Sequence, residues 1–258
     1  MDPEIFDRIQ SAEISPDLKT ALENTVRAAI DLLPGLNRVQ RRRYPILLDH
    51  LVKEAIDPQL EPQWWETTLD LWGKTARDAS ENGLALLNAI GGLHPLLEVR
   101  LGLGGKVTLR EITMDTVLGI CMLSDTLSEP KINFVAPNVY SLAQAHFHDY
   151  AWFRAIYAGR APVGFIMIVD GEPEEEKGGK PVYFLWRLMI AGPFQGRGYG
   201  RQAIECLVEY VSSRPEATEL LVSCGQGNGS PQGFYESLGF VLTGDVLDHE
   251  VVLRLPLE

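Results

Sequence analysis

The stretch from Gln195 to Gly200, Gln-Gly-Arg-Gly-Tyr-Gly, has the composition of an anion-binding loop. It follows an apolar run at 182–190 and precedes residues with helical periodicity. Glycine lets backbone N–H groups approach an anion closely, because no Cβ intervenes. The N–H groups at a helix start, with the positive end of the helix dipole behind them, also favour negative charge. The pattern indicates a pyrophosphate-binding loop, and the alternative is an ordinary tight turn before a surface helix.

Two arginines lie in or beside this loop. Arg197 and Arg201 could add charge-assisted hydrogen bonds to phosphate oxygens. Two familiar nucleotide-binding motifs, by contrast, do not fit the loop. A P-loop would need a Lys-Ser/Thr pair after the glycines, and none is present. A dinucleotide fingerprint would need a βαβ unit with an acidic residue about 20 positions on, and we do not expect these glycines to complete one.

The composition predicts a cytoplasmic protein. Its 258 residues carry a net charge of −12, which disfavours nucleic acid and anionic membranes as partners. No apolar run approaches the roughly 18 residues of a membrane span, and the acidic N-terminus lacks an apolar signal core. Three cysteines at unrelated spacings argue against a disulfide framework or a zinc site and for a reducing compartment. We therefore expect no metal.

Residues 1–100 are predicted to form an all-helical accessory domain. Apolar positions recur with the helical period in four segments, at 16–33, 46–55, 65–79 and 84–90, the last of them ending before Gly91-Gly92. The glycines at 102, 104 and 105 mark a junction, after which the pattern changes. Such a domain would either cover a substrate site in the rest of the chain or mediate self-association, for example as a homodimer.

Residues 105–258 are predicted to be a second domain of mixed strands and helices. The strand candidates are 107–113, 151–157, 163–169, 182–190, 220–223, 240–243 and 251–255. Helices are expected at 114–122, 138–147, directly after the glycine loop, and at 230–237. The polar stretch 170–179 is predicted to be a long connection, whose glutamates either gather a polyamine or simply remain solvated.

This order of elements, together with two motifs, resembles the GNAT acetyltransferase superfamily over about residues 105–257. The first motif is the loop from Gln195 to Gly200, which fits the family pattern Gln/Arg-x-x-Gly-x-Gly/Ala. The second is Phe234-Tyr235-Glu236-Ser237-Leu238-Gly239-Phe240, which looks like the family's helix carrying the thiolate proton donor. Trp186-Arg187 with Gly229-Ser230-Pro231 looks closest to the spermine/spermidine acetyltransferase-like branch. The resemblance implies an α+β fold, with a mixed, mostly antiparallel central sheet flanked by helices.

The resemblance also implies acetyl-CoA as the acetyl donor and assigns residues to its binding. The loop residues Gln195, Gly196, Arg197, Gly198, Tyr199 and Gly200, with Arg201, would hold the pyrophosphate. Backbone N–H groups near Leu188, Met189 and Ile190 would polarise the thioester carbonyl. Asn228 would bond the pantetheine amide, or else is only a turn residue.

Tyr235 is the expected catalytic residue, as proton donor to the departing thiolate. A phenol has an ordinary pKa of about 10 against about 8.5 for a thiol, so it stays protonated at neutral pH. Its alternative role is that of a core tyrosine beside Phe234.

The residue that accepts the proton of the attacking amine is not evident. Residues 181–200 contain no carboxylate, and Ala191 stands where this branch often carries Asp. Trp186 either lines the acceptor pocket or is a plain core aromatic. The proton would pass through water, or to a carboxylate elsewhere such as Asp149.

Taken together, the sequence predicts an N-acetyltransferase that moves acetyl from acetyl-CoA to a primary amine by direct attack in a ternary complex. The acceptor would be a polyamine or another small cationic amine. The alternatives are an acetyltransferase acting on a protein or antibiotic amine, and a CoA-binding regulatory module without catalysis.

Overall fold

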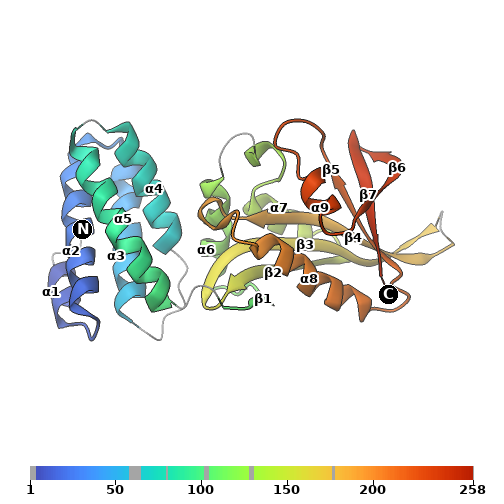
Figure 1. The fold of residues 1–258 in the computed structure, drawn as a ribbon, viewed down its shortest axis with the longest axis horizontal. Coiled ribbons are helices and arrows are strands. Elements are labelled where there is room, and N and C mark those ends of the chain that lie inside the picture. Colours follow the sequence, from blue (N-terminus) through green and yellow to red (C-terminus); the bar gives the residue numbers. More distant parts are fainter. Residues whose placement is uncertain are drawn as a thin grey trace. The chain divides into compact units, whose positions relative to one another are not determined.

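The computed structural model describes residues 4–57, 65–79, 81–101, 105–127, 131–175 and 178–257 (Figure 1). The chain divides into two compact units, Met1–Gly105 with Gly159–Ala161, and Lys106–Ala158 with Pro162–Glu258. Of the glycines expected to mark the junction, Gly102 and Gly104 lie outside the described residues.

The first unit is built from helices. They are α1 (Ile5–Ser11), α2 (Pro16–Leu32), α3 (Arg38–Ile56), α4 (Trp65–Asp78) and α5 (Glu81–Leu101). Their starts follow from local hydrogen bonding, because Ser15 Oγ accepts from Leu18 N at α2 and Asn37 forms a capping box at α3. At α4, the buried carboxylate of Glu54 accepts a hydrogen bond of 2.9 Å from Trp65 N. A negative charge there complements the helix dipole.

The structure corrects two of the predicted helices of this unit. Helix α5 does not stop before Gly91-Gly92 but runs on to Leu101, because buried Leu86, Leu93 and Leu97 continue one apolar stripe past the glycines. Packing of that stripe outweighs the roughly 1 kcal/mol that a glycine costs in a helix. Helix α3 begins at Arg38, earlier than predicted, and α1 was not predicted.

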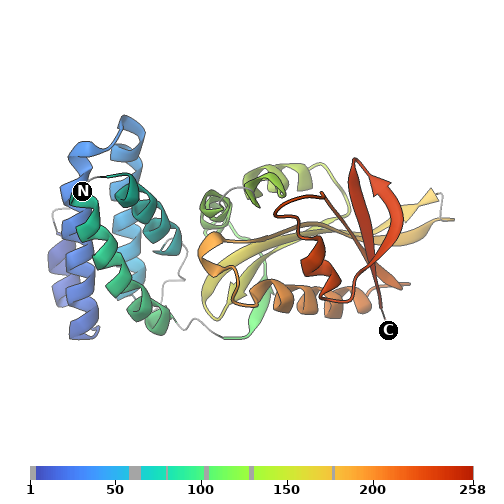
Figure 2. The same ribbon diagram turned by 45° about the horizontal axis from the view of Figure 1, so that its top comes forward.

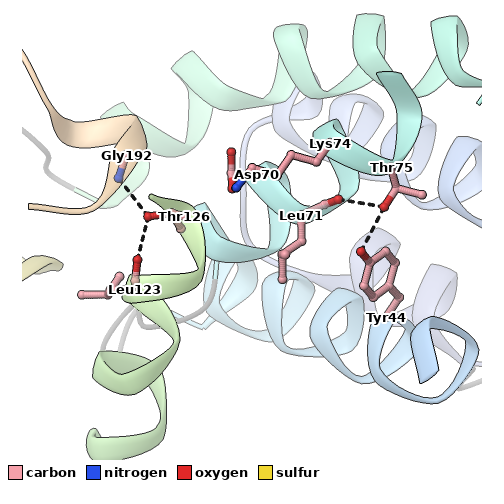
Figure 3. Close-up of polar contacts among 8 residues, drawn as sticks. All are labelled: Tyr44, Asp70, Leu71, Lys74, Thr75, Leu123, Thr126 and Gly192. Atoms are coloured by element: carbon pink, nitrogen blue, oxygen red, sulfur yellow. Dashed lines mark hydrogen bonds and ion pairs between the residues drawn. The ribbon is translucent and has the colours of Figure 1, made fainter. Parts of the chain in front are cut away.

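Polar contacts within α4, and one between α3 and α4, add to the apolar packing of the helical unit (Figure 3). Tyr44 Oη and Thr75 Oγ1 lie 2.9 Å apart, and Thr75 Oγ1 donates to Leu71 O at 3.0 Å. Lys74 Nζ and Asp70 Oδ2 form an ion pair of 2.9 Å on α4. The Tyr44–Thr75 pair satisfies two hydroxyls at the helix crossing, where an unpaired one would cost about 1–3 kcal/mol.

The second unit contains a seven-stranded sheet in the order β1-β2-β3-β4-β5-β7-β6. Its strands are β1 (Val107–Arg110), β2 (Ala151–Ala158), β3 (Ala161–Glu174), β4 (Lys180–Ile190), β5 (Glu219–Cys224), β6 (Val241–Leu247) and β7 (Glu250–Pro256). Strands β4 and β5 run parallel, and the pairs β1–β2, β3–β4, β5–β7 and β6–β7 are antiparallel. The sheet is therefore mixed and mostly antiparallel, as predicted.

Helices cover both faces of this sheet. Helices α6 (Val117–Met122) and α7 (Asn138–Ala145) lie on one face, and α8 (Tyr199–Ser212) lies along the other (Figures 1 and 2). The short α9 (Gln232–Glu236) follows β5. The α8 face buries Ala203, Leu207 and Val211, whose spacing matches the helical period.

The polar stretch 170–179 is mostly strand rather than a long connection. Strand β3 continues to Glu174 and β4 already begins at Lys180. The two strands pair from Gly164↔Ile190 out to Glu174↔Lys180, so the pairing overrides the polar composition.

A tight backbone contact fixes the turn that precedes the glycine loop (Figure 3). Thr126 Oγ1 donates to Leu123 O at 2.7 Å and accepts from Gly192 N at 2.8 Å. A Cβ at Gly192 would stand 2.3 Å from Thr126 O, so only glycine fits. This contact joins the 3₁₀ turns Leu123–Thr126 and Gly192–Phe194 within the second unit.

Candidate active site

The glycine loop has the backbone geometry of an anion cradle. Gly196 and Gly198 adopt φ of 76° and 82°, a left-handed conformation that strains other residues. Gly198 is the N-cap of α8, and no described side chain caps this helix start. The first N–H groups of α8 have no partner within the helix and are therefore available to a ligand. Gly196, Gly198 and Gly200 all line a cavity.

Cationic side chains lie beside this loop. Lys131 Nζ donates to Gln195 Oε1, and Gln195 Nε2 donates to Ile190 O at 2.9 Å. Arg201 Nη2 donates to Ser237 O at 3.2 Å. Lys131, Gln195 and Arg201 line the cavity, whereas Arg197 is exposed and is not among its lining residues. The loop end of the cavity therefore combines backbone donors with positive charge, which suits a diphosphate.

Strands β4 and β5 separate beside the cavity. Their parallel pairing consists of Phe184↔Leu221 and Leu185↔Val222 and goes no further along β4. A bulge in β4 falls at the same place, because β3 pairs with Leu185 and Arg187 and skips Trp186. The backbone from Trp186 to Ile190, including Leu188 and Met189, then runs along the cavity wall. This is the place where the sequence analysis expected backbone donors for a thioester carbonyl.

Tyr235 lies in the same cavity on α9. Its side chain is only 5% exposed and packs between Phe234 and Phe240, at centroid distances of 5.3 Å and 5.5 Å. Burial raises the pKa of the phenol, and the negative charges of Cys224 and Glu250 raise it further. The phenol is thus held protonated at neutral pH.

The cavity is large enough for two ligands. Its volume is about 1210 Å³, which exceeds the roughly 300–1,000 Å³ usual for one small-molecule site. It brings together Gln195, Gly196, Gly198, Tyr199, Gly200, Arg201, Leu188, Met189, Ile190, Trp186 and Tyr235.

Two further candidates lie away from the cavity wall. Asp149 is exposed in the turn after α7, and Asn228 is exposed in the loop after β5. Neither lines the cavity, although Gly229 and Ser230, next to Asn228, do. Glu172, Glu174 and Glu175 of the acidic stretch also lie outside it, and Glu176 is outside the described residues.

Several lining residues were missed by the sequence analysis. Lys131 and Gln144 come from the segment between α6 and β2, and Arg187 from β4. Arg187 Nη2 donates to Gln144 Oε1 at 3.1 Å, and burial lowers the pKa of its guanidinium, while Glu250 opposes that shift. Glu250 comes from the start of β7, about 50 positions after the glycine loop. No local motif marks Lys131, Gln144 or Glu250, and Arg187 was noted only as part of the Trp186-Arg187 pair.

The part of the chain that the structure describes shows neither a metal-binding cluster nor a membrane-spanning helix. Within it, no group of three or more His, Cys, Asp or Glu residues gathers as metal ligands would. No helix there combines the length and the apolar character needed to cross a membrane.

The comparison with protein families agrees with this geometry. Residues 122–240 match the acetyltransferase (GNAT) family. This segment is a GNAT acetyltransferase domain. It holds the glycine loop, the β4–β5 separation and Tyr235, whereas β1, β6 and β7 lie outside the matched segment. No family matches the helical unit, and no curated protein sequence matches the chain.

Solved structures of acetyltransferases are similar to part of this chain. One from Thermus thermophilus is 21% identical, with a TM-score of 0.44, covering 59% of this chain and 97% of that one. The ribosomal-protein-S18-alanine N-acetyltransferase of Escherichia coli is 14% identical, with a TM-score of 0.43, covering 59% and 94%. An acetyltransferase of Salmonella typhimurium that modifies the N-terminal serine of L7/L12 is 16% identical, with a TM-score of 0.45, covering 59% and 96%. These identities and TM-scores carry no information on which acceptor substrate this protein would use.

Proposed function

We propose that this protein is an acetyl-CoA-dependent N-acetyltransferase that acts on a primary amine by direct attack in a ternary complex. The observation that carries the proposal is a single cavity in the GNAT domain. Its wall includes the glycine loop before α8, residues of β4 and β5 where these strands separate, and buried Tyr235. Diphosphate binding and thiolate protonation would take place within one cavity.

The donor would be held mainly by backbone atoms. The N–H groups from Gly196 to Gly200, helped by Lys131 and Arg201, would bind the diphosphate, with Arg197 reaching it from the exposed side of the loop. The backbone of Leu188, Met189 and Ile190 would polarise the thioester carbonyl. Backbone donors aimed at a developing oxyanion are worth about 3–4 kcal/mol.

Tyr235 would protonate the leaving thiolate. Its raised pKa would keep the proton on the phenol until the C–S bond breaks, and its place in the cavity wall supports access to a sulfur bound there. Asn228, exposed beside lining residues Gly229 and Ser230, would contact the pantetheine arm only after a movement of its loop.

The acceptor would be a cationic amine, with a polyamine or another small amine as the first choice. Support comes from the two carboxylates among the described lining residues, Asp248 and Glu250, and from Trp186, whose ring could contact an alkyl chain. An amine on a protein or an antibiotic fits the same chemistry. Asp149 is exposed outside the cavity and would act only at its entrance.

The helical unit would be an accessory domain, with self-association as one role. We place the protein in a reducing compartment such as the cytoplasm, because Cys121, Cys206 and Cys224 form no disulfide.

A binding module without catalysis is the second candidate, because β4 carries no carboxylate between Lys180 and Ile190. Full-length protein is incubated with acetyl-CoA and a panel of spermidine, lysine, a peptide with a free N-terminus and an aminoglycoside, and free thiol is measured. The proposal expects thiol release that depends on at least one amine. Acetyl-CoA binding without amine-dependent thiol release would favour the binding module, and absence of binding would overturn both.

A further inference from the structure

We propose that Glu250 binds the ammonium group of the acceptor and removes its proton before attack. This inference rests on the proposed function and supplies the carboxylate that β4 lacks. Glu250 lies outside the segment that matches the GNAT family, so the support for its role comes from the structure of this chain and not from the family match.

A tight hairpin places Glu250 at the cavity. Leu247 of β6 pairs with Glu250 of β7, so Asp248 and His249 form a two-residue turn. Both adopt positive φ, 47° and 71°, as a type I′ turn requires. Asp248 is exposed at the turn, whereas Glu250 is half-buried as the first residue of β7. Of these two carboxylates, the one held within the sheet is Glu250.

Ser223 of β5 orients this carboxylate. Its Oγ donates a hydrogen bond to Glu250 Oε2. Ser223 lines the cavity between Val222 and Cys224, directly after the point where β5 stops pairing with β4. Among the described residues, none donates to the other carboxylate oxygen, which is therefore available to an ammonium group.

The electrostatic neighbours of Glu250 connect it to the rest of the proposed site. Burial raises the pKa values of Tyr235 on α9 and Cys224 on β5, and the negative charge of Glu250 raises them further; the same charge opposes the burial that lowers the pKa of Arg187 on β4. The Glu250 carboxylate is thus close enough to interact electrostatically with Tyr235, the proposed proton donor to the thiolate. It also interacts with Arg187 of β4, the strand whose backbone is proposed to polarise the thioester carbonyl. A base for the amine and an acid for the thiolate are needed in one reaction centre, and these two groups are both in the cavity wall.

Glu250 and Tyr235 together account for every proton that moves in the reaction. Glu250 takes one proton from the ammonium, and the freed lone pair forms the C–N bond at the thioester carbonyl carbon. As the C–S bond breaks, Tyr235 gives its proton to the thiolate, and the second amine proton returns to the tyrosinate through water. The proton on Glu250 leaves to solvent, so acetyl-CoA and an ammonium give an amide, CoA thiol and one released proton.

The test compares Glu250→Gln with Glu236→Gln. Glu236 is exposed on α9, accepts a hydrogen bond of 2.7 Å from Gln232 Nε2, and does not line the cavity, so this control makes the same charge change. The acceptors are the panel amine with the highest turnover and hydroxylamine, which is largely neutral at pH 7. Calorimetry with acetyl-CoA and thermal melting confirm that each variant binds its donor and folds.

We expect Glu250→Gln to lower kcat/KM for the cationic amine by about 100-fold, the usual scale of general base catalysis. The loss with hydroxylamine should be much smaller, because no proton has to be removed before attack. In the variant, kcat/KM for the cationic amine should rise with pH as more free amine forms in solution. Glu236→Gln should resemble the wild type.

Three outcomes would overturn the inference. They are an unchanged kcat/KM in Glu250→Gln, an equal loss with both acceptors, and a loss in Asp248→Asn but not in Glu250→Gln. A wild type that releases no thiol with any amine would instead contradict the proposed function, so the two failures are distinguishable.

Ser223 is a positioning residue in this scheme and has its own test. Ser223→Ala should lower kcat for the cationic amine about tenfold and leave hydroxylamine turnover largely unchanged, because only the orientation of Glu250 is lost. Ser223→Thr keeps the hydroxyl and should restore most of the rate. If both variants behave alike with both acceptors, Ser223 has only a structural role.

Discussion

Phe234 of α9 packs against Gly200 of α8 so closely that a Cβ at Gly200 would stand 3.3 Å from Phe234 Cζ. This contact joins the two sequence motifs, because Gly200 ends the glycine loop and Phe234 precedes Tyr235. The position of the proposed proton donor is thereby coupled to the proposed diphosphate site.

Gly200→Ala should therefore impair catalysis through α9. The methyl group would push Phe234 and with it Tyr235, at a cost of about 1–3 kcal/mol for overpacking. Gly233→Ala is the matched control, since nothing lies within 4 Å of a Cβ there. Turnover and thermal melting of both variants check this. Equal turnover in the two variants would show that the contact has no part in positioning Tyr235.

Gly198→Ala should weaken acetyl-CoA binding. The space around a Cβ is open, so the cost comes from backbone strain at φ of 82°, about 1–2 kcal/mol. Gly178→Ala in the β3–β4 turn, at φ of 72°, should lose similar stability but keep its affinity. Calorimetry and thermal melting separate the two effects. If both variants bind acetyl-CoA like the wild type, the loop geometry is unimportant for the ligand.

Tyr235→Phe should lower kcat about tenfold or more with little change in acetyl-CoA affinity, because only the hydroxyl proton is removed. Single-turnover thiol release and calorimetry test this. The buried ring remains in place between Phe234 and Phe240, so thermal stability should change little. An unchanged kcat would remove the proton-donor role.

Lys131→Gln should raise the acetyl-CoA dissociation constant about tenfold, from the loss of one charged hydrogen bond worth roughly 1.5–3 kcal/mol. Its ammonium lies beside the loop through its bond to Gln195. The wild-type affinity should also fall with added salt, and the variant's should fall less. Lys180→Gln, an exposed lysine that does not line the cavity, is the control. Parallel salt dependence in all three proteins would place Lys131 outside the site.

Cys224 should be alkylated slowly below pH 8 and faster as the pH rises. Burial, to 3% exposure, raises the pKa of its thiol, so the reactive thiolate is scarce at neutral pH. Acetyl-CoA should protect Cys224, because this residue lines the cavity. Mass spectrometry after iodoacetamide treatment measures both effects. Rapid alkylation at pH 7 that acetyl-CoA does not slow would contradict the placement of the ligand.

Local patterns in the sequence predicted the strand candidates and the glycine loop, because both depend on neighbouring residues, whereas the mixed sheet was implied by the resemblance to the GNAT superfamily. The two motifs around Gly198 and Tyr235 were each contiguous and therefore recognisable. By contrast, the length of α5 depended on a stripe that includes Leu93 and Leu97 and continues beyond two glycines. That extension is a tertiary effect, since burial of the stripe outweighs the local helix-breaking tendency.

Among the residues that line the proposed acceptor end of the cavity, the sequence indicated only Trp186. Glu250 reaches this end through pairing of β7 with β5, which sets Ser223 opposite Val252 and the hairpin turn just beyond. Gln144, and Lys131 at the glycine-loop end of the cavity, both come from the region before β2. Such long-range placements carry no spacing rule, so only the folded sheet shows that these side chains share one cavity.

The loop around Gly198 is proposed to hold the diphosphate of acetyl-CoA. Calorimetry with acetyl-CoA and with S-acetylpantetheine, which lacks the diphosphate, tests it most directly. We predict saturable binding of acetyl-CoA and at least about tenfold weaker binding of S-acetylpantetheine, since charge-assisted hydrogen bonds are lost. Equal affinities, or no acetyl-CoA binding at millimolar concentration, would contradict the account.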